Sequence, residues 1–110
     1  MSYVHDIAKR KGLKIVDSKH PATVKVSPAD IEKAKSLNSK QCAFARAALR
    51  EPGVLGAYFF RSVAFIEYKD CMVRFALPQR VRDEIITFDR AGFMEPGKYV
   101  INPLWPSHEK

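Results

Sequence analysis

Some segments of the chain alternate polar and apolar residues, and in others the apolar residues recur every three or four positions. Residues 23–26 alternate polar and apolar side chains, which is typical of a half-buried strand. The Ser-Pro-Ala-Asp motif at 27–30 then predicts a helix start, because serine caps free N–H groups, proline suits the first turn and an acid there complements the helix dipole. We expect this helix to place Ile31 and Ala34 against the core and to end near residues 36–39.

Two further helices are predicted from apolar residues that recur three or four positions apart. The helix over 40–50 is rich in alanine, is stopped by a Pro-Gly pair, and has a buried stripe of Cys42, Ala45 and Leu49. Arg46 and Arg50 fall one turn apart on another side of this helix. The helix over 79–89 has a buried stripe of Val81, Ile85 and Phe88.

Short strands rich in aromatic and aliphatic residues are predicted over 54–60, 62–68 and 71–77. The turn at 69–70 is expected to join the last two as a hairpin. Side chains alternate along them so that one face of the sheet is expected to be dry and the other mixed. A final strand over 98–101 is expected to pair with residues 23–26 and to close the sheet.

These elements predict a single small α+β domain with a mainly antiparallel sheet of three to five strands and three main helices. The domain is expected to occupy residues 21–102. Residues 1–20 are expected to form a basic N-terminal arm or a short helix over 3–10. Residues 103–110 contain two prolines and are expected to be an irregular tail.

The composition fits a folded domain and adds a preference for anionic partners. Of 110 residues, 46% are hydrophobic and 28% are charged, which argues against disorder and against a need for disulfides. The net charge of +7 favours nucleic acid, nucleotides or acidic proteins as partners. Neither a membrane-spanning run nor a signal-peptide pattern is present, so we expect a cytoplasmic protein without a membrane partner.

No arrangement of residues indicates catalysis. His5, His20 and His108 lie far from one another and from the cysteines, so no metal site is predicted. Cys42 and Cys71 are expected to be buried thiols of a reducing compartment. The sequence has neither a nucleophile elbow nor a phosphate-binding glycine loop. We therefore expect a protein that is not an enzyme and that carries no cofactor.

Basic residues form the predicted binding surface for nucleic acid or another anion. They comprise an N-terminal set, a pair on the second helix, a pair at the start of the third helix and one arginine within an apolar strand: Lys9, Arg10, Lys11, Lys14, Arg46, Arg50, Arg80, Arg82 and Arg74. Cations in the first turn of a helix oppose its dipole, so the pair at 80 and 82 suggests an anion site. Ordinary surface arginines are the alternative, and Arg74 would then pair with Glu67 across the strands.

Large apolar residues give a second set of candidates. Leu104 and Trp105 in the tail are predicted to anchor a protein partner, with docking on their own domain as the alternative. Aromatic residues of the sheet, such as Tyr58 and Tyr68, would stack nucleobases if the sheet were open. Core packing explains them better, because the consensus of RNA-binding sheets is absent.

Two runs of residues resemble a loosely defined group of small phage and prophage proteins. The first contains Val-x-Val, Asp-Ile and Cys-Ala-x-Ala within residues 24–45, and the second contains Leu-Pro, Ile-Ile-x-Phe-Asp and Gly within residues 77–92. The resemblance covers residues 22–101 and includes no catalytic residue. It implies an accessory protein of a phage or mobile element that acts by binding, in the cytoplasm of the host cell.

Three functions follow from these observations. The first is binding of nucleic acid or a nucleotide through the basic surface, with an affinity that falls as salt rises. The alternative is a protein-binding inhibitor of a host defence or another host factor, anchored by Leu104 and Trp105. A further alternative is a structural or assembly subunit of a virion, which predicts a homo-oligomer.

Overall fold

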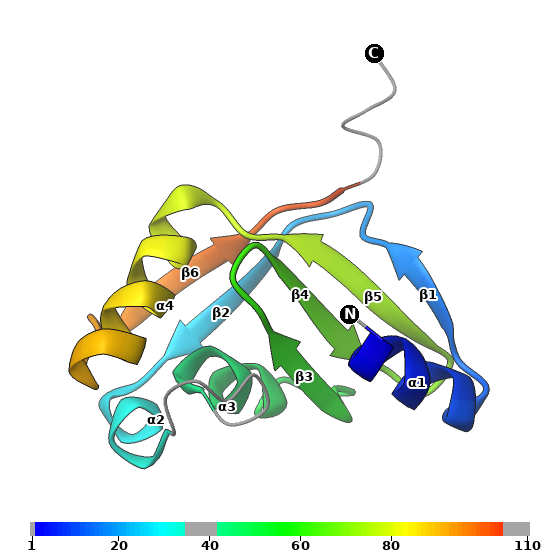
Figure 1. Cartoon of the computed structure of the whole chain (residues 1–110), viewed down its shortest axis with the longest axis horizontal. Helices are drawn as coiled ribbons and strands as arrows, with labels where there is room; N and C mark the ends of the chain where they lie inside the picture. Colours follow the sequence, from blue (N-terminus) through cyan, green and yellow to red (C-terminus); the bar gives the residue numbers. More distant parts are fainter. Residues whose placement is uncertain (1, 35–41, 105–110) are drawn as a thin grey trace.

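The computed structural model describes residues 2–34 and 42–104 of the chain (Figure 1). Helices and strands are intermixed along these residues. Their order is α1 (Ser2–Lys11), β1 (Lys14–Asp17), β2 (Ala22–Val26), α2 (Pro28–Lys33), α3 (Ala43–Leu49), β3 (Gly56–Phe59), β4 (Val63–Glu67), β5 (Cys71–Ala76), α4 (Gln79–Ala91) and β6 (Gly97–Ile101).

The predicted α+β class is confirmed. The main sheet has the strand order β1-β5-β4-β3, in which β3, β4 and β5 are antiparallel and β1 is parallel to β5. The predicted hairpin at 69–70 joins β4 to β5, and the predicted pairing of 23–26 with 98–101 is found between β2 and β6. These two strands form a sheet of their own instead of closing the main one, and an isolated bridge between Ala76 and Asn102 links the two sheets.

The main sheet carries a different core on each face, because neighbouring residues of a strand point to opposite sides. On one face, Ala64 and Ile66 of β4 join the larger core, to which β2, β6, α3 and α4 also contribute. On the other face, Phe65 packs with buried side chains of β3, β5 and α1, namely Tyr58, Met72, Val4, Ile7 and Ala8. Figure 1 shows α1 next to the main sheet, well away from α2 and α3.

The N-terminal segment is part of this second core. α1 is the short helix that the sequence offered as one possibility, and Gly12, with a φ of 70°, follows it. β1 was not predicted, because its four residues, two charged and two apolar, are too few to show the alternation that distinguishes a strand from a loop. Its pairing with β5 makes residues 14–17 an edge strand of the main sheet.

α3 buries a different set of residues from the one predicted. Cys42 is the buried N-cap of α3, but Leu49 is 43% exposed, so the predicted stripe is wrong at its far end. Phe44 takes the inner position and stacks on Phe59 with ring centroids 5.5 Å apart. The small alanines of α3 let this helix approach the sheets closely. Residues 40 and 41 of the predicted helix lie outside the described residues.

α4 agrees with its prediction. Its stripe of Val81, Ile85 and Phe88 is buried, and Gly92 caps it in the left-handed conformation with a φ of 72°. None of the helices in the described part of the chain is long and apolar enough to cross a membrane.

Candidate anion-binding pocket

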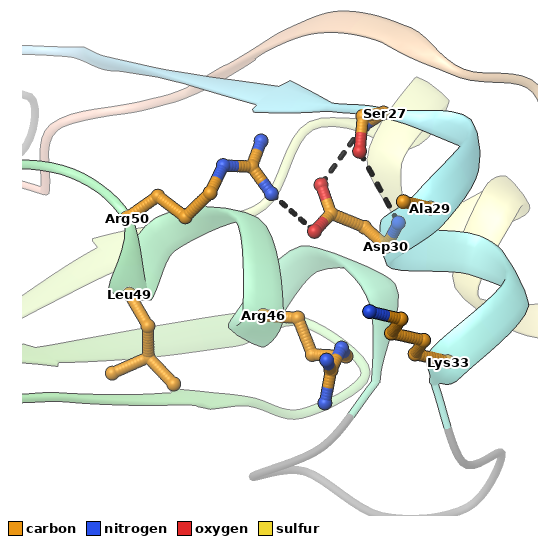
Figure 2. A pocket seen from close by; sticks show the side chains of 7 residues that line it. All are labelled: Ser27, Ala29, Asp30, Lys33, Arg46, Leu49 and Arg50. Carbon is orange, nitrogen blue, oxygen red and sulfur yellow. Dashed lines mark hydrogen bonds and ion pairs between the residues drawn. The ribbon is translucent and has the colours of Figure 1, made fainter.

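An open pocket of about 550 Å³ lies between α2 and α3 (Figure 2). Both helices and the cap that precedes α2 line it, through Ser27, Ala29, Asp30, Lys33, Arg46, Leu49 and Arg50. Leu49 and the C-cap residue Arg50 lie three and four residues after Arg46, so one side of α3 faces the pocket. The volume lies within the range of small-ligand sites, about 300–1,000 Å³. We call this site the α2–α3 pocket.

Asp30 organises one wall of the α2–α3 pocket. Its backbone N–H donates to Ser27 Oγ at 3.2 Å and its Oδ2 accepts from Ser27 N–H at 2.9 Å, which forms a capping box. Its Oδ1 accepts from Arg50 Nη1. Burial acts to raise the pKa of Asp30, but the bonds from Arg50 and Ser27 outweigh it and the pKa is lowered. Asp30 is therefore ionised at neutral pH.

Arg50 joins three elements of the fold. Besides its ion pair with Asp30, it donates from Nη2 to the Lys25 carbonyl of β2 at 2.8 Å. The bond to Asp30 raises the pKa of Arg50, although burial acts in the opposite direction. Arg50 therefore links α3 to both α2 and β2.

Arg46 lies one turn before Arg50 but has different surroundings. Within the described residues, no carboxylate forms an ion pair with Arg46 or with Lys33 on the opposite wall. The Arg46 Nε–H is shielded and has no hydrogen-bond acceptor among these residues. Three cations and one carboxylate line the pocket, so it holds two positive charges in excess. Guanidinium and ammonium donors around an open cavity suit an oxyanion such as phosphate.

Two other predicted cations are paired with carboxylates on the α1 side of the main sheet. Lys11 Nζ donates to Glu67 Oε2 at 2.9 Å, and Glu67 Oε1 accepts from the Tyr58 hydroxyl at 3.3 Å. Arg74 pairs with Asp17 at 2.7 Å, so the predicted pair of Arg74 with Glu67 is wrong. The physical reason is β1, whose parallel register sets Asp17 directly beside Arg74.

The two arginines at the start of α4 contact their own domain. The Arg80 guanidinium carbon lies 4.3 Å from the centroid of the Tyr99 ring, and its Nη1 donates to the Lys98 carbonyl at 3.1 Å. Arg82 donates to the side chain of Gln79 at 2.9 Å. These contacts hold both arginines against their own domain, and the Arg82 Nε–H, like that of Arg46, is shielded and has no acceptor among the described residues.

The remaining predicted cations lie on α1 and at the start of β1. Lys9, Arg10 and Lys14 are exposed and form no ion pair with the described residues. A smaller pocket of about 260 Å³ lies beside them, lined by Ile7, Arg10, Lys11 and Tyr58. None of these residues lines the α2–α3 pocket, so the structure does not gather the predicted basic residues at one place.

The remaining residues considered in the sequence are the two cysteines and the two apolar residues of the tail. Cys42 is buried, and burial raises the pKa of its thiol, but Cys71 is half-exposed, so only one of the two thiols is buried as predicted. Leu104 is half-buried and its N–H donates to the Ser18 carbonyl at 3.1 Å. Trp105 lies outside the described residues, and anchoring of a protein partner stays a prediction. No cluster of three metal-ligating side chains occurs in residues 2–34 and 42–104.

The capping motif predicted the start of α2, but the sequence did not indicate that α2 lines a pocket. Lys33 was not among the predicted binding residues. Lys33 lies one turn after Asp30, so the capping motif was the feature of the sequence that could have indicated this residue. Its position opposite Arg46 depends on how α2 packs against α3, and the periodicity of a single helix does not encode that packing.

Comparison with protein families, curated proteins and solved structures gives no match to this chain. The resemblance to small phage proteins stays a prediction. The side chains of the α2–α3 pocket are therefore the basis for the function proposed below.

Proposed function

We propose that this protein binds nucleic acid and that the α2–α3 pocket holds phosphate groups of its backbone. One observation carries the proposal: two cations that have no carboxylate partner among the described residues, Arg46 and Lys33, line one open pocket. Arg46 and Lys33 then supply a fork of N–H donors and a point charge.

The overall charge and the shape of the pocket support a polymer with many phosphates. The net charge of +7 attracts a polyanion over distances longer than one contact. The pocket is open to the surface, so a backbone can cross it without being enclosed. Each neutralised phosphate releases counterions, so the affinity should fall steeply as salt rises.

The proposed activity is binding and not turnover. A hydroxyl and a carboxylate do line the pocket, in Ser27 and Asp30, but each is bonded to the backbone of the other. These bonds cap α2, and Asp30 also holds Arg50. We therefore assign Ser27 and Asp30 a structural role in this wall of the pocket.

Fluorescence anisotropy of a labelled single-stranded oligonucleotide, at low and near-physiological salt, tests the proposal. We expect Arg46→Ala to weaken binding by about tenfold and to reduce the salt slope by about one. Arg90→Ala is the matched control, because Arg90 is an exposed arginine of α4 outside the pocket. Equal losses in both variants would show that net charge alone drives binding and would contradict the proposed site.

A further inference from the structure

Two neighbouring cavities share Tyr68 and Ala22 in their walls. The smaller, of about 220 Å³, lies between the end of α3 and β2 and includes Glu51 in its lining. The larger, of about 510 Å³, is lined by apolar residues that include Val73 and Phe75 and by polar residues between β1 and β2 that include Ser18 and His20. Because Tyr68 borders both, we call the two cavities together the Tyr68 groove.

Tyr68 presents an aromatic side chain to this groove. Tyr68 directly follows β4. Its side chain is on the same face as those of Ala64 and Ile66, and it is half-buried against the larger core. The Tyr68 hydroxyl has no hydrogen-bond partner in the described part of the chain. Burial raises the pKa of Tyr68, and the nearby Cys71 and Glu51 raise it further, so the ring is neutral at physiological pH.

The Tyr68 groove adjoins the α2–α3 pocket at the end of α3. Arg50 lines the pocket and Glu51, the next residue, lines the groove. Their Cα atoms are therefore about 3.8 Å apart. Arg50 also bonds the Lys25 carbonyl, and the preceding residue of β2, Val24, lines the groove. The pocket and the groove are thus lined by consecutive residues at the end of α3.

We propose that Tyr68 is a stacking platform for unpaired nucleobases of a single strand whose phosphates occupy the α2–α3 pocket. This inference rests on the proposed function and deepens it. A cationic site next to a groove that contains an aromatic side chain matches the two halves of a nucleotide, its phosphate and its base. Duplex bases are already stacked and paired, so the groove favours single strands.

The test compares a labelled single strand, an abasic strand of the same length, which keeps the phosphates, and a duplex. We expect wild-type protein to bind the base-bearing single strand about tenfold more tightly than the abasic strand. Tyr68→Ala should remove that difference and leave the affinity for the abasic strand unchanged. Tyr68→Phe should retain it, because the ring remains. Phe93→Ala is the matched control, since Phe93 is 57% exposed and lines neither cavity.

Each outcome separates the inference from the proposed function. If Tyr68→Ala binds the base-bearing strand as tightly as wild type, the stacking platform is wrong and the phosphate site stands. Preference for the duplex over the single strand also overturns the inference. If wild-type protein binds neither strand at low salt, the proposed function fails and the inference fails with it. The affinity for the abasic strand shows whether Tyr68→Ala is folded.

Discussion

The α1 side of the main sheet and the α2–α3 pocket both carry basic side chains, but their surroundings differ. On the α1 side, Lys11 is paired with the buried Glu67, and Arg74 is paired with Asp17. In the pocket, Asp30 pairs with Arg50 alone, and Arg46 has no such partner among the described residues. Lys9 and Arg10 on α1 also lack a carboxylate partner among the described residues, so Arg46 is distinguished by sharing an open pocket with a second unpaired cation, Lys33.

The largest expected effect is on stability, from Asp30→Ala. This change removes the capping box of α2 and the ion pair with Arg50, and we expect a loss of about 2 kcal/mol in the free energy of unfolding. Urea denaturation measures it. Glu32→Ala on the same helix is the control, because Glu32 is exposed and should change stability by less than about 0.5 kcal/mol. A loss of similar size in both variants would show that Asp30 does not organise this wall.

On the α1 side, Gly56→Ala should destabilise the fold without changing nucleic-acid binding. A Cβ at Gly56 would lie 2.6 Å from Glu67 Oε1, and Glu67 is held by Lys11 and Tyr58. We expect a loss of about 1–2 kcal/mol from this crowding, measured by thermal unfolding. In a Glu67→Ala background the cost should largely disappear. A weakened affinity for oligonucleotide at unchanged fold would mean that the α1 side takes part in binding.

In the pocket, Asp30→Asn should strengthen binding. Asparagine keeps an acceptor for the Ser27 N–H and removes the negative charge, so Arg50 becomes available to the ligand. Removing one charge near the phosphate is worth about 1 kcal/mol, so we expect a gain of about fivefold in affinity by anisotropy. Unchanged or weaker binding would argue against a phosphate beside Arg50.

The pH dependence of stability provides another test of Asp30. Because its pKa is lower in the folded state than in the unfolded chain, its ionisation stabilises the fold above the unfolded value and is lost as the pH falls through the folded one. The difference in melting temperature between wild type and Asp30→Asn should therefore be constant above about pH 5 and shrink below about pH 4. A difference that persists unchanged in acid would contradict the ion pair with Arg50.

The smallest expected effect concerns the two cysteines. Cys42 starts α3 and is 8% exposed with a raised pKa, whereas Cys71 starts β5 and is half-exposed. A thiol reagent should modify Cys71 quickly and Cys42 only on unfolding. Mass spectrometry of Cys71→Ser should then show no rapid modification. Rapid modification of that variant would mean that α3 opens readily.

Local patterns predicted most of the elements but few of the contacts between them. The stripe of α4 and the pairing of β2 with β6 followed from periodicity and chemistry that short segments carry. β1 was missed because its four residues show no clear strand pattern by themselves. They form a strand because they pair with β5. The exposure of Leu49 could not be predicted from the stripe, since the packing of α3 buries the side that carries Phe44 and leaves Leu49 on the side that lines the pocket.

The candidate site was predicted only in part. Arg46 and Arg50 were identified as a pair, but their different roles depend on Asp30, which lies 20 residues before Arg50. Lys33 joins them only through the packing of α2 on α3. Arg80 was expected to meet an anion and instead lies over Tyr99, a contact that requires β6 beside α4.

The most direct test of the phosphate site is a ¹H–¹⁵N NMR titration of the protein with a single-stranded oligonucleotide, observing backbone amides and arginine Nε–H groups. We predict the largest shifts at Arg46 Nε–H and at the amides of Ser27 and Lys33, with small shifts at Lys9 and Arg10. Shifts that concentrate on α1 and leave Arg46 unmoved would contradict the assignment of the α2–α3 pocket as the phosphate site.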